Sequence, residues 1–113
     1  MPTSPGQAAP GANAVNDFVA QVQANGYEVV SREVSFNTPF GQRKYDLVLR
    51  NPATGATSGV EIKSSAGAMN RWDADARQQF AADRWINMNG GATSVGGAGK
   101  GGIEIQSTYK IQW

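Results

Sequence analysis

The feature that most limits how this chain can fold is a run of three β-rich segments separated by two short turns. The segments are rich in β-branched and aromatic residues and cover positions 27–36, 44–50 (KYDLVLR) and 59–64 (GVEIKS). The turns carry the Asn, Pro and Gly of tight connections, at positions 37–41 (NTPFG) and 51–55 (NPATG). Strands joined by connections this short pair antiparallel. The sequence therefore predicts two consecutive hairpins over residues 27–64.

Helical patterns flank the hairpins. Apolar residues recur at helical spacing before a stop at Asn25-Gly26, which predicts a helix over residues 13–25 with Val15, Phe18, Val19 and Val22 on its buried side. A second helix is predicted over residues 70–88, and we expect its apolar face, which carries Trp72, Ala76 and Phe80, to lie in the core. A last strand is expected over residues 103–113.

The predicted order αβββαβ indicates an α/β or α+β domain with a mixed central sheet flanked by helices. Residues 1–12 (MPTSPGQAAPGA) are predicted to be a flexible linker or tail, and residues 13–113 one domain. The Gly-rich stretch 90–102 is predicted to be a flexible connection. It is not a phosphate-binding loop, because neither Ser nor Thr follows Lys100 and no helix opens after it.

Composition restricts the chemistry available to the chain. Its 113 residues include no Cys and no His, which excludes disulfides, thiolate or imidazole zinc sites and every Ser-His-Asp arrangement. A formal charge of +1 gives the chain no overall positive charge that would indicate binding to a polyanion such as nucleic acid. The chain has no run of apolar residues long enough to span a membrane and no signal peptide, so we expect export to require a larger protein upstream. An enzyme of this composition would depend on carboxylates, Lys, Tyr and a hard metal ion.

Strand register brings acidic residues together. If the second hairpin is centred on residues 52–55, facing residue numbers sum to 107, so Asp46 faces Glu61 and Lys44 faces Lys63. If the first hairpin turns at Pro39-Phe40, facing numbers sum to 79, so Glu33 faces Asp46. Three carboxylates would then lie side by side with Cβ atoms roughly 4.5–5.5 Å apart. Lys63 follows Glu61 by two residues and shares its face, whereas Tyr45, Leu47 and Leu49 are expected on the other face with Val60 and Ile62.

Such a row of like charges destabilises a sheet unless something neutralises it. A divalent cation such as Mg²⁺ would do so, since it accepts one or two carboxylates together with water and phosphate oxygens. The metal would polarise a phosphoryl oxygen and acidify water, and Lys63 would position that water or stabilise the developing charge. The alternative is a solvated surface on which opposite charges alternate.

The segment KYDLVLRNPATGATSGVEIKSS resembles the core of the PD-(D/E)xK nuclease superfamily, in which an Asp and a (D/E)-x-K lie on adjacent strands. The preceding REVSFNTPFGQRKYD is similar to toxin domains of that superfamily at the C-termini of bacterial polymorphic toxins, including contact-dependent growth inhibition proteins. The resemblance covers about residues 13–110 and implies a restriction-endonuclease-like αβββαβ core.

By this resemblance Asp46, Glu61 and Lys63 form the catalytic triplet, with Asp46 and Glu61 as metal ligands. Glu33 corresponds to an additional acid and metal ligand on the first strand, and Gln78 or Gln79 to a substrate-contacting Gln on the helix. Tyr45 replaces the Pro of the motif, and the first helix offers Asp17 where Glu is frequent.

The resemblance implies a nuclease that uses Mg²⁺ or Mn²⁺, Zn²⁺ being less expected, and hydrolyses phosphodiester bonds of DNA or tRNA. It also implies an antibacterial toxin domain that is delivered as part of a larger exported protein. Such a domain acts in the cytoplasm of the target cell and is neutralised by a cognate immunity protein. The alternatives are a non-catalytic nucleic-acid-binding module or a protein-interaction domain on the same fold.

Cationic and aromatic side chains are the remaining candidates for substrate contacts. Arg43 and Lys44 adjoin the acids on the predicted second strand, and phosphate contacts are also open to Arg50, Lys63, Arg71, Arg77 and Arg84. Charged residues on a helix are more often plain solvated surface. Trp72, Trp85 and Trp113 could stack on bases, but the apolar spacing of Trp72 and Trp85 predicts that these two lie in the core first.

Overall fold

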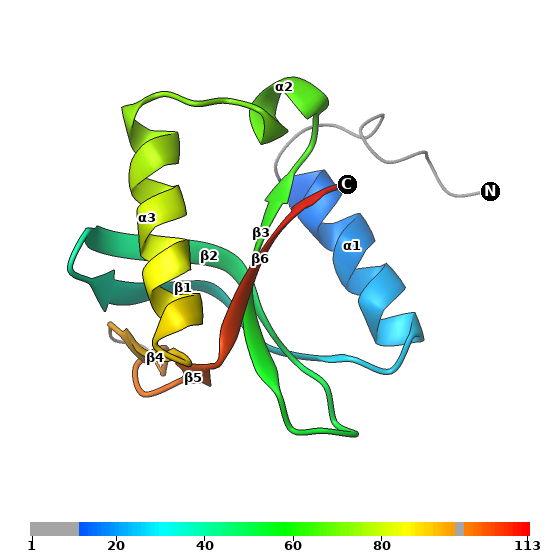
Figure 1. Cartoon of the computed structure of the whole chain (residues 1–113). Helices are drawn as coiled ribbons and strands as arrows, with labels where there is room; N and C mark the ends of the chain where they lie inside the picture. Colours follow the sequence, from blue (N-terminus) through cyan, green and yellow to red (C-terminus); the bar gives the residue numbers. More distant parts are fainter. Residues whose placement is uncertain (1–11, 97–98) are drawn as a thin grey trace.

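The computed structural model describes residues 12–96 and 99–113, so most of the predicted linker lies outside the described residues. The chain is a mixed α+β domain in which helices cover a six-stranded mixed sheet. The helices are α1 (Ala12–Ala24), α2 (Ala66–Met69) and α3 (Ala74–Met88). The strands are β1 (Glu28–Thr38), β2 (Gly41–Arg50), β3 (Thr57–Lys63), β4 (Ala92–Val95), β5 (Glu104–Ile105) and β6 (Ser107–Gln112). The strand order across the sheet is β5-β4-β1-β2-β3-β6 (Figure 1).

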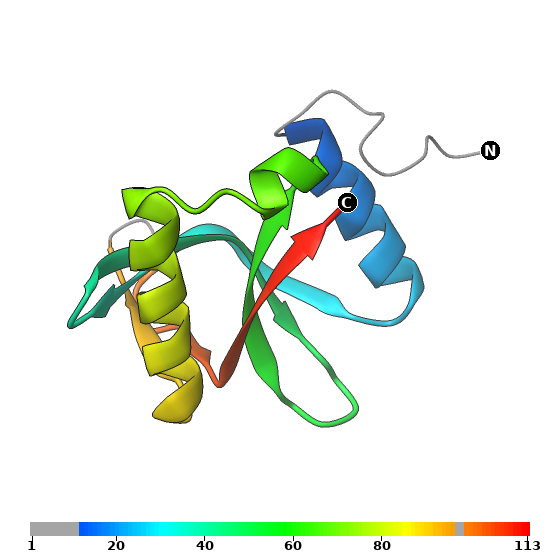
Figure 2. The same cartoon turned by 45° about the horizontal axis from the view of Figure 1, so that its top comes forward.

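Both predicted hairpin registers are confirmed. In the first hairpin Ser35 faces Lys44 and Thr38 faces Gly41, so facing numbers sum to 79 around the turn at Pro39-Phe40. In the second, facing residues run from Leu47 opposite Val60 to Arg50 opposite Thr57, which sum to 107. The hairpin between β2 and β3 extends away from the helices at one end of the molecule (Figure 2).

The predicted second helix begins four residues later than expected, and a separate short helix, α2, precedes it. Ser65 caps α2 by accepting a hydrogen bond from the backbone N–H of Ala68. Asp73 caps α3 in the same way from Ala76, at 2.9 Å. A side-chain oxygen that satisfies a free N–H starts a helix at that point, and α3 therefore begins at Ala74 rather than at residue 70.

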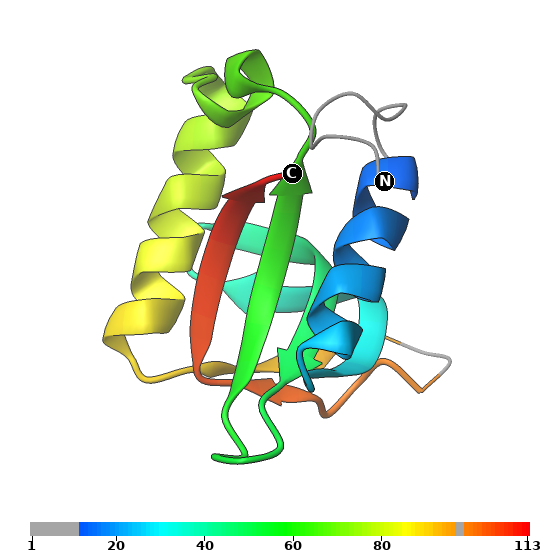
Figure 3. The same ribbon diagram turned by 90° about the vertical axis from the view of Figure 1, so that its right-hand side faces the viewer.

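The C-terminal strand is also divided, because its two parts pair with different strands. β5 pairs antiparallel with β4, which lies inside the Gly-rich stretch expected to be a loop. β6 pairs in parallel with β3 along its whole length. The two strands run side by side, with α3 and α1 on either side of them (Figure 3).

Two core clusters lie on opposite faces of the sheet. Val34, Phe36, Tyr45, Val48 and Ile86 pack on the α3 side, and Phe18, Val19, Leu47, Leu49 and Val60 on the α1 side. The expected common face of Tyr45 and Leu47 is therefore wrong. The buried side chains of β1 change from one core to the other at Glu33, and those of β2 change at Asp46. Glu33 has a left-handed backbone with φ of 52°. A residue in this conformation interrupts the regular alternation of side chains along a strand.

The inward side of α3 also differs from the expected one. Ala76, Ala82 and Ile86 are its buried residues, whereas Trp72 and Phe80 are 58% and 54% exposed. The prediction that Trp72 and Phe80 belong to the core is therefore wrong. Among the described residues no helix has the length and apolar character needed to cross a membrane.

Candidate functional site

Asp46 and Glu61 meet where β2 and β3 separate. The backbone pairing of these strands ends at Leu47 and Val60, one residue before the two acids. Beyond that point the Asp46 side chain replaces the backbone pairing, since its Oδ2 accepts a hydrogen bond of 2.7 Å from the backbone N–H of Ile62. The divergence of the strands thus opens a gap in which the Asp46 carboxylate lies beside Glu61.

Glu61 is 7% exposed and is approached by two cations. Its Oε1 accepts a hydrogen bond of 2.5 Å from Nη1 of Arg43. The ammonium of Lys63 lies against Oε2. Apart from this ion pair with Lys63, the buried Oε2 has no hydrogen-bond partner within the described residues. A buried carboxylate oxygen left in this state is available to a further ligand.

Arg43 links Glu61 to α3. Its guanidinium is buried and donates from Nε to Oδ1 of Asp83 at 2.8 Å and from Nη2 to Oδ2 at 3.3 Å. The hydroxyl of Tyr45 also donates to Oδ1 of Asp83, and the Arg43 guanidinium lies 4.4 Å from the centre of the Tyr45 ring. Four side chains are thus connected from the helix to the acid pair, in the order Tyr45, Asp83, Arg43 and Glu61.

These contacts set the protonation of the network. Burial alone would lower the pKa of Arg43, but the hydrogen bond and charge of Asp83 and the charge of Glu61 raise it above its ordinary value. Burial raises the pKa of the Tyr45 phenol, and the hydrogen bond to Asp83 raises it further. Arg43 therefore stays charged and Tyr45 stays protonated at neutral pH.

The two acids shift in opposite directions. Burial raises the pKa of Asp46 more than the Ile62 hydrogen bond lowers it, and the charge of Glu61 adds to the rise. Burial would also raise the pKa of Glu61, but Lys63 and Arg43 together outweigh it and lower the pKa. Two adjacent carboxylates with pKa values moved apart are typical of functional sites.

Glu33 and Lys44 do not join the acid pair. Although register places Glu33 at the level of Asp46, its left-handed backbone directs the side chain to solvent, where its Oε1 lies 3.2 Å from Nζ of Lys44. Both side chains are more than half exposed. Lys44 and Lys63 do not face each other, because the β2–β3 pairing has already ended. The described residues contain no group of three or more acids able to hold a metal.

The remaining candidate substrate contacts divide between the site and the surface. Gln78 donates a hydrogen bond of 2.8 Å to the backbone carbonyl of Phe40 and so ties α3 to the β1–β2 turn. Gln79 lies one helical turn before Asp83, on the side of α3 that carries the network. Arg43 is 2% exposed and has its guanidinium engaged by two carboxylates, so it supports Glu61 rather than offering a surface for phosphate.

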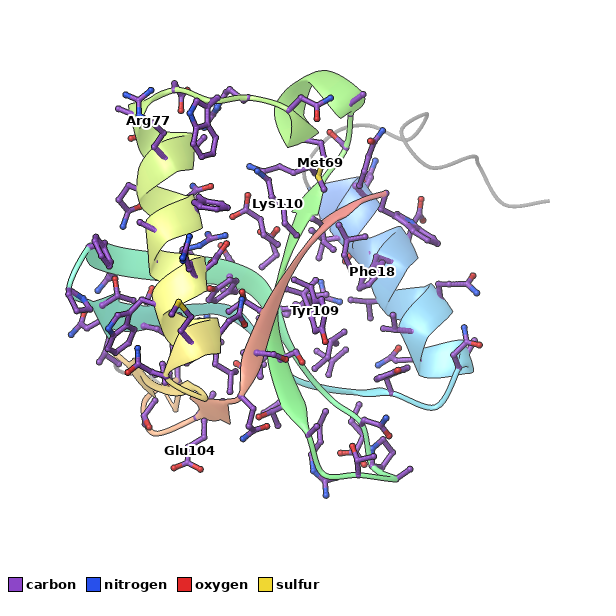
Figure 4. The ribbon with its side chains drawn as sticks, in the orientation of Figure 1. Phe18, Met69, Arg77, Glu104, Tyr109 and Lys110 are labelled. Atoms are coloured by element: carbon purple, nitrogen blue, oxygen red, sulfur yellow. The ribbon has the colours of Figure 1, made fainter. Side chains whose placement is uncertain are left out.

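Sequence reasoning missed the role of Asp83 and the position of Lys110. Asp83 carries a readable signal, since it follows Gln79 by four residues on the inward side of the helix. Lys110 carries none, because only the parallel pairing with β3 sets it beside Glu61. Adjacent residues of a parallel pair point to the same face, and Lys110 lies on the α3 side of the sheet, whereas Tyr109 lies toward Phe18 of α1 (Figure 4).

The donor set fits one hard divalent cation. Asp46 offers the carboxylate oxygen that Ile62 does not bind, and Glu61 offers Oε2, which the Lys63 ammonium contacts. Mg²⁺ is held in proteins by one or two carboxylates, with water and substrate phosphate completing its octahedron. Zinc is disfavoured, because the chain has neither His nor Cys.

Comparison of the sequence with protein-family models, with curated proteins and with solved structures finds no significant match.

Proposed function

We propose that this chain is a metal-dependent nuclease with a restriction-endonuclease-like core of the PD-(D/E)xK type. The observation that carries the proposal is the pairing of Asp46 with Glu61 at the separation of β2 and β3, where Oε2 of Glu61 is buried without a hydrogen-bond partner. Lys63 is 19% exposed and touches that same oxygen. A bound cation would take the place of the Lys63 ammonium at Oε2 and leave the ammonium free for substrate.

The residues have separate roles in the proposed hydrolysis. Asp46 and Glu61 would hold Mg²⁺ or Mn²⁺, and a bound ion would supply Lewis acidity toward the phosphate and toward a water molecule. Lys63 donates to the attacking water or to a non-bridging phosphate oxygen and stabilises the charge that develops there. Arg43 fixes the rotamer of Glu61, and the lowered pKa of Glu61 keeps that carboxylate charged at neutral pH.

The biological setting that we propose follows the sequence resemblance to toxin domains. The domain would be the C-terminal part of a larger exported protein, would act on DNA or tRNA in the cytoplasm of a target bacterium, and would be neutralised by a cognate immunity protein. The proposal rests on the segments quoted above and on the acid pair.

The test is cleavage of plasmid DNA and of total tRNA with Mg²⁺, with Mn²⁺ and with EDTA. We expect metal-dependent cutting that is lost in Glu61→Gln and in Lys63→Gln. The matched control is Glu104→Gln, an exposed Glu on β5, far from Lys110 and the upper part of α3 (Figure 4), which should cut like wild type.

A second readout separates metal binding from catalysis. A cation that binds only the folded protein raises its melting temperature. We expect Mg²⁺ or Mn²⁺ to raise it in wild type and in Lys63→Gln but not in Glu61→Gln. Folded protein that neither cuts nor responds to either metal would refute the proposal and favour a binding module.

A further inference from the structure

The outward side of α3 carries a stripe of cations and apolar residues that the acid pair does not use. Arg77, Phe80, Arg84 and Met88 follow one another at intervals of three and four residues, so they lie along one side of the helix. All four are exposed, Phe80 by 54% and Met88 by 72%. An exposed aromatic ring on a helix that buries mainly Ala is the reverse of the usual amphipathic arrangement.

Two further aromatic rings extend this stripe. Trp72 is 58% exposed and packs edge-on against Phe80, with ring centres 5.4 Å apart. Phe40, at the tip of the β1–β2 turn, is 52% exposed, and the bond from Gln78 to its carbonyl holds the turn beside α3. An open groove of about 310 Å³ lies between Phe40, Phe80, Arg84 and Met88. We call Phe40, Trp72, Arg77, Phe80, Arg84 and Met88 the outer face.

The outer face carries the cations Arg77 and Arg84, and the acid at its Trp72 end, Asp73, is paired with Arg71 and also lies near Arg77. Asp83 lies about 60° around α3 from Phe80 and about 100° from Arg84, and its carboxylate is bound by Arg43. Asp75 precedes Arg77 by two residues and so lies about 200° from it around the helix. Arg84 donates to Sδ of Met88, and Arg77 to the carbonyl of Trp72. Neither arginine is paired with a carboxylate of the described residues.

We propose that the outer face binds single-stranded nucleic acid, with unpaired bases stacked on Phe80, Trp72 and Phe40 and phosphates held by Arg77 and Arg84. Aromatic rings interspersed with cations match a ligand that alternates flat bases with negative charges. A duplex hides the faces of its bases and offers only phosphates. An apolar protein surface would leave both arginines without counter-charges, which disfavours that partner.

This inference goes beyond the proposed cleavage and does not require it. The outer face and the Asp83–Arg43–Glu61 contacts lie on adjoining sides of one helix, whose diameter with side chains is about 10–12 Å. A single strand held on the outer face would reach the acid pair within a few nucleotides. The proposed nuclease would then act on unpaired segments, such as loops or ends, in preference to duplex.

The test is fluorescence anisotropy with a short labelled single-stranded oligonucleotide and with its duplex, as DNA and as RNA. EDTA is present throughout, so that binding is measured without cleavage. We expect wild type to bind the single strand at least about tenfold more tightly than the duplex. Phe80→Ala should weaken single-strand binding by about 5- to 150-fold, the range for loss of one stacked base.

The matched control is Tyr109→Ala, because Tyr109 is similarly exposed, at 56%, but lies on the α1 side of the sheet. It should bind like wild type, and both variants should melt within a few degrees of it because both rings are exposed. Arg84→Gln should make single-strand binding less dependent on salt, by about 0.7 in the logarithmic slope.

Equal affinity for single strand and duplex would overturn the inference, as would no binding at all. Equal weakening by Phe80→Ala and Tyr109→Ala would also overturn it. If the nuclease proposal is wrong, the cleavage assay will show no metal-dependent cutting. That result does not affect the binding measured in EDTA.

Discussion

Arg43 is the residue whose loss should most affect the stability of the domain. It is 2% exposed, and its guanidinium binds Glu61 at 2.5 Å and Asp83 at 2.8 Å. Replacement by Met fills a similar volume but leaves both carboxylates facing an apolar side chain. Removing one partner of a buried ion pair costs about 3–5 kcal/mol, because the remaining charge is left uncompensated.

Urea denaturation measures this loss. With a denaturant slope of about 1.5 kcal/mol/M, the midpoint of Arg43→Met should fall by about 2–3 M at pH 7. The matched control is Arg50→Met, which removes an exposed pair with Glu28 whose side chains are 41% and 55% exposed. Exposed pairs contribute about 1 kcal/mol or less, so the control midpoint should fall by less than about 0.7 M.

The pH dependence identifies the cause. Arg43 helps to lower the pKa of Glu61, so this pair stabilises the protein above the ordinary pKa of Glu and ceases to do so as pH falls through the lowered value. Without Arg43, only Lys63 offsets the effect of burial, which raises the pKa of Glu61. The difference between wild type and Arg43→Met should therefore be largest at neutral pH and should shrink below about pH 4. Equal midpoints for Arg43→Met and Arg50→Met, or a difference independent of pH, would refute this reasoning.

Three more predictions address the site and the frame that supports it. Lys110→Gln removes the partly exposed cation that the β3–β6 pairing sets beside Glu61, and the loss of about 1 kcal/mol should raise the KM for the cleaved polymer about fivefold. An unchanged KM in initial-rate measurements would count against it. Asp46→Asn should raise the melting temperature in EDTA, because burial raises the pKa of Asp46 and the charged acid therefore lowers stability above its ordinary pKa. The same variant should lose its stabilisation by Mg²⁺. A lower melting temperature in EDTA would contradict this account. Gly91→Ala should cost about 2–4 kcal/mol in urea denaturation, since its Cβ would lie 2.2 Å from the carbonyl oxygen of Ile105 at φ of 137°. Gly55→Ala, at φ of 77° in open space, should cost only about 1–2 kcal/mol, and equal losses would show that the contact with Ile105 is unimportant.

The two hairpins could be predicted because their information is local. Pro39-Phe40 and the NPATG segment fix where the chain reverses, and the point of reversal fixes which residues face each other. The approach of Asp46 to Glu61 follows from that register alone. Lys63 follows from its spacing of two residues after Glu61 on the same strand.

The outer face could not be predicted from the periodicity of α3. Trp72 and Phe80 have the spacing of a buried stripe, but the inward side of the helix carries Ala76, Ala82 and Ile86. Small residues let α3 approach the sheet closely enough for Asp83 to reach Arg43. A hydrophobic pattern cannot tell which of two possible faces the sheet will accept.

By itself the sequence determined the helix–hairpin–hairpin order, the two registers and the meeting of Asp46, Glu61 and Lys63, because each depends on neighbours in the chain. Only the tertiary structure decided that Glu33 turns away, that β6 sets Lys110 beside Glu61, and that Asp83 joins α3 to the acids through Arg43. These outcomes depend on how a strand passes between two cores and on pairing between distant segments. Such contacts are fixed by the burial of both helices on opposite faces of one sheet, a condition that no local stretch of sequence contains.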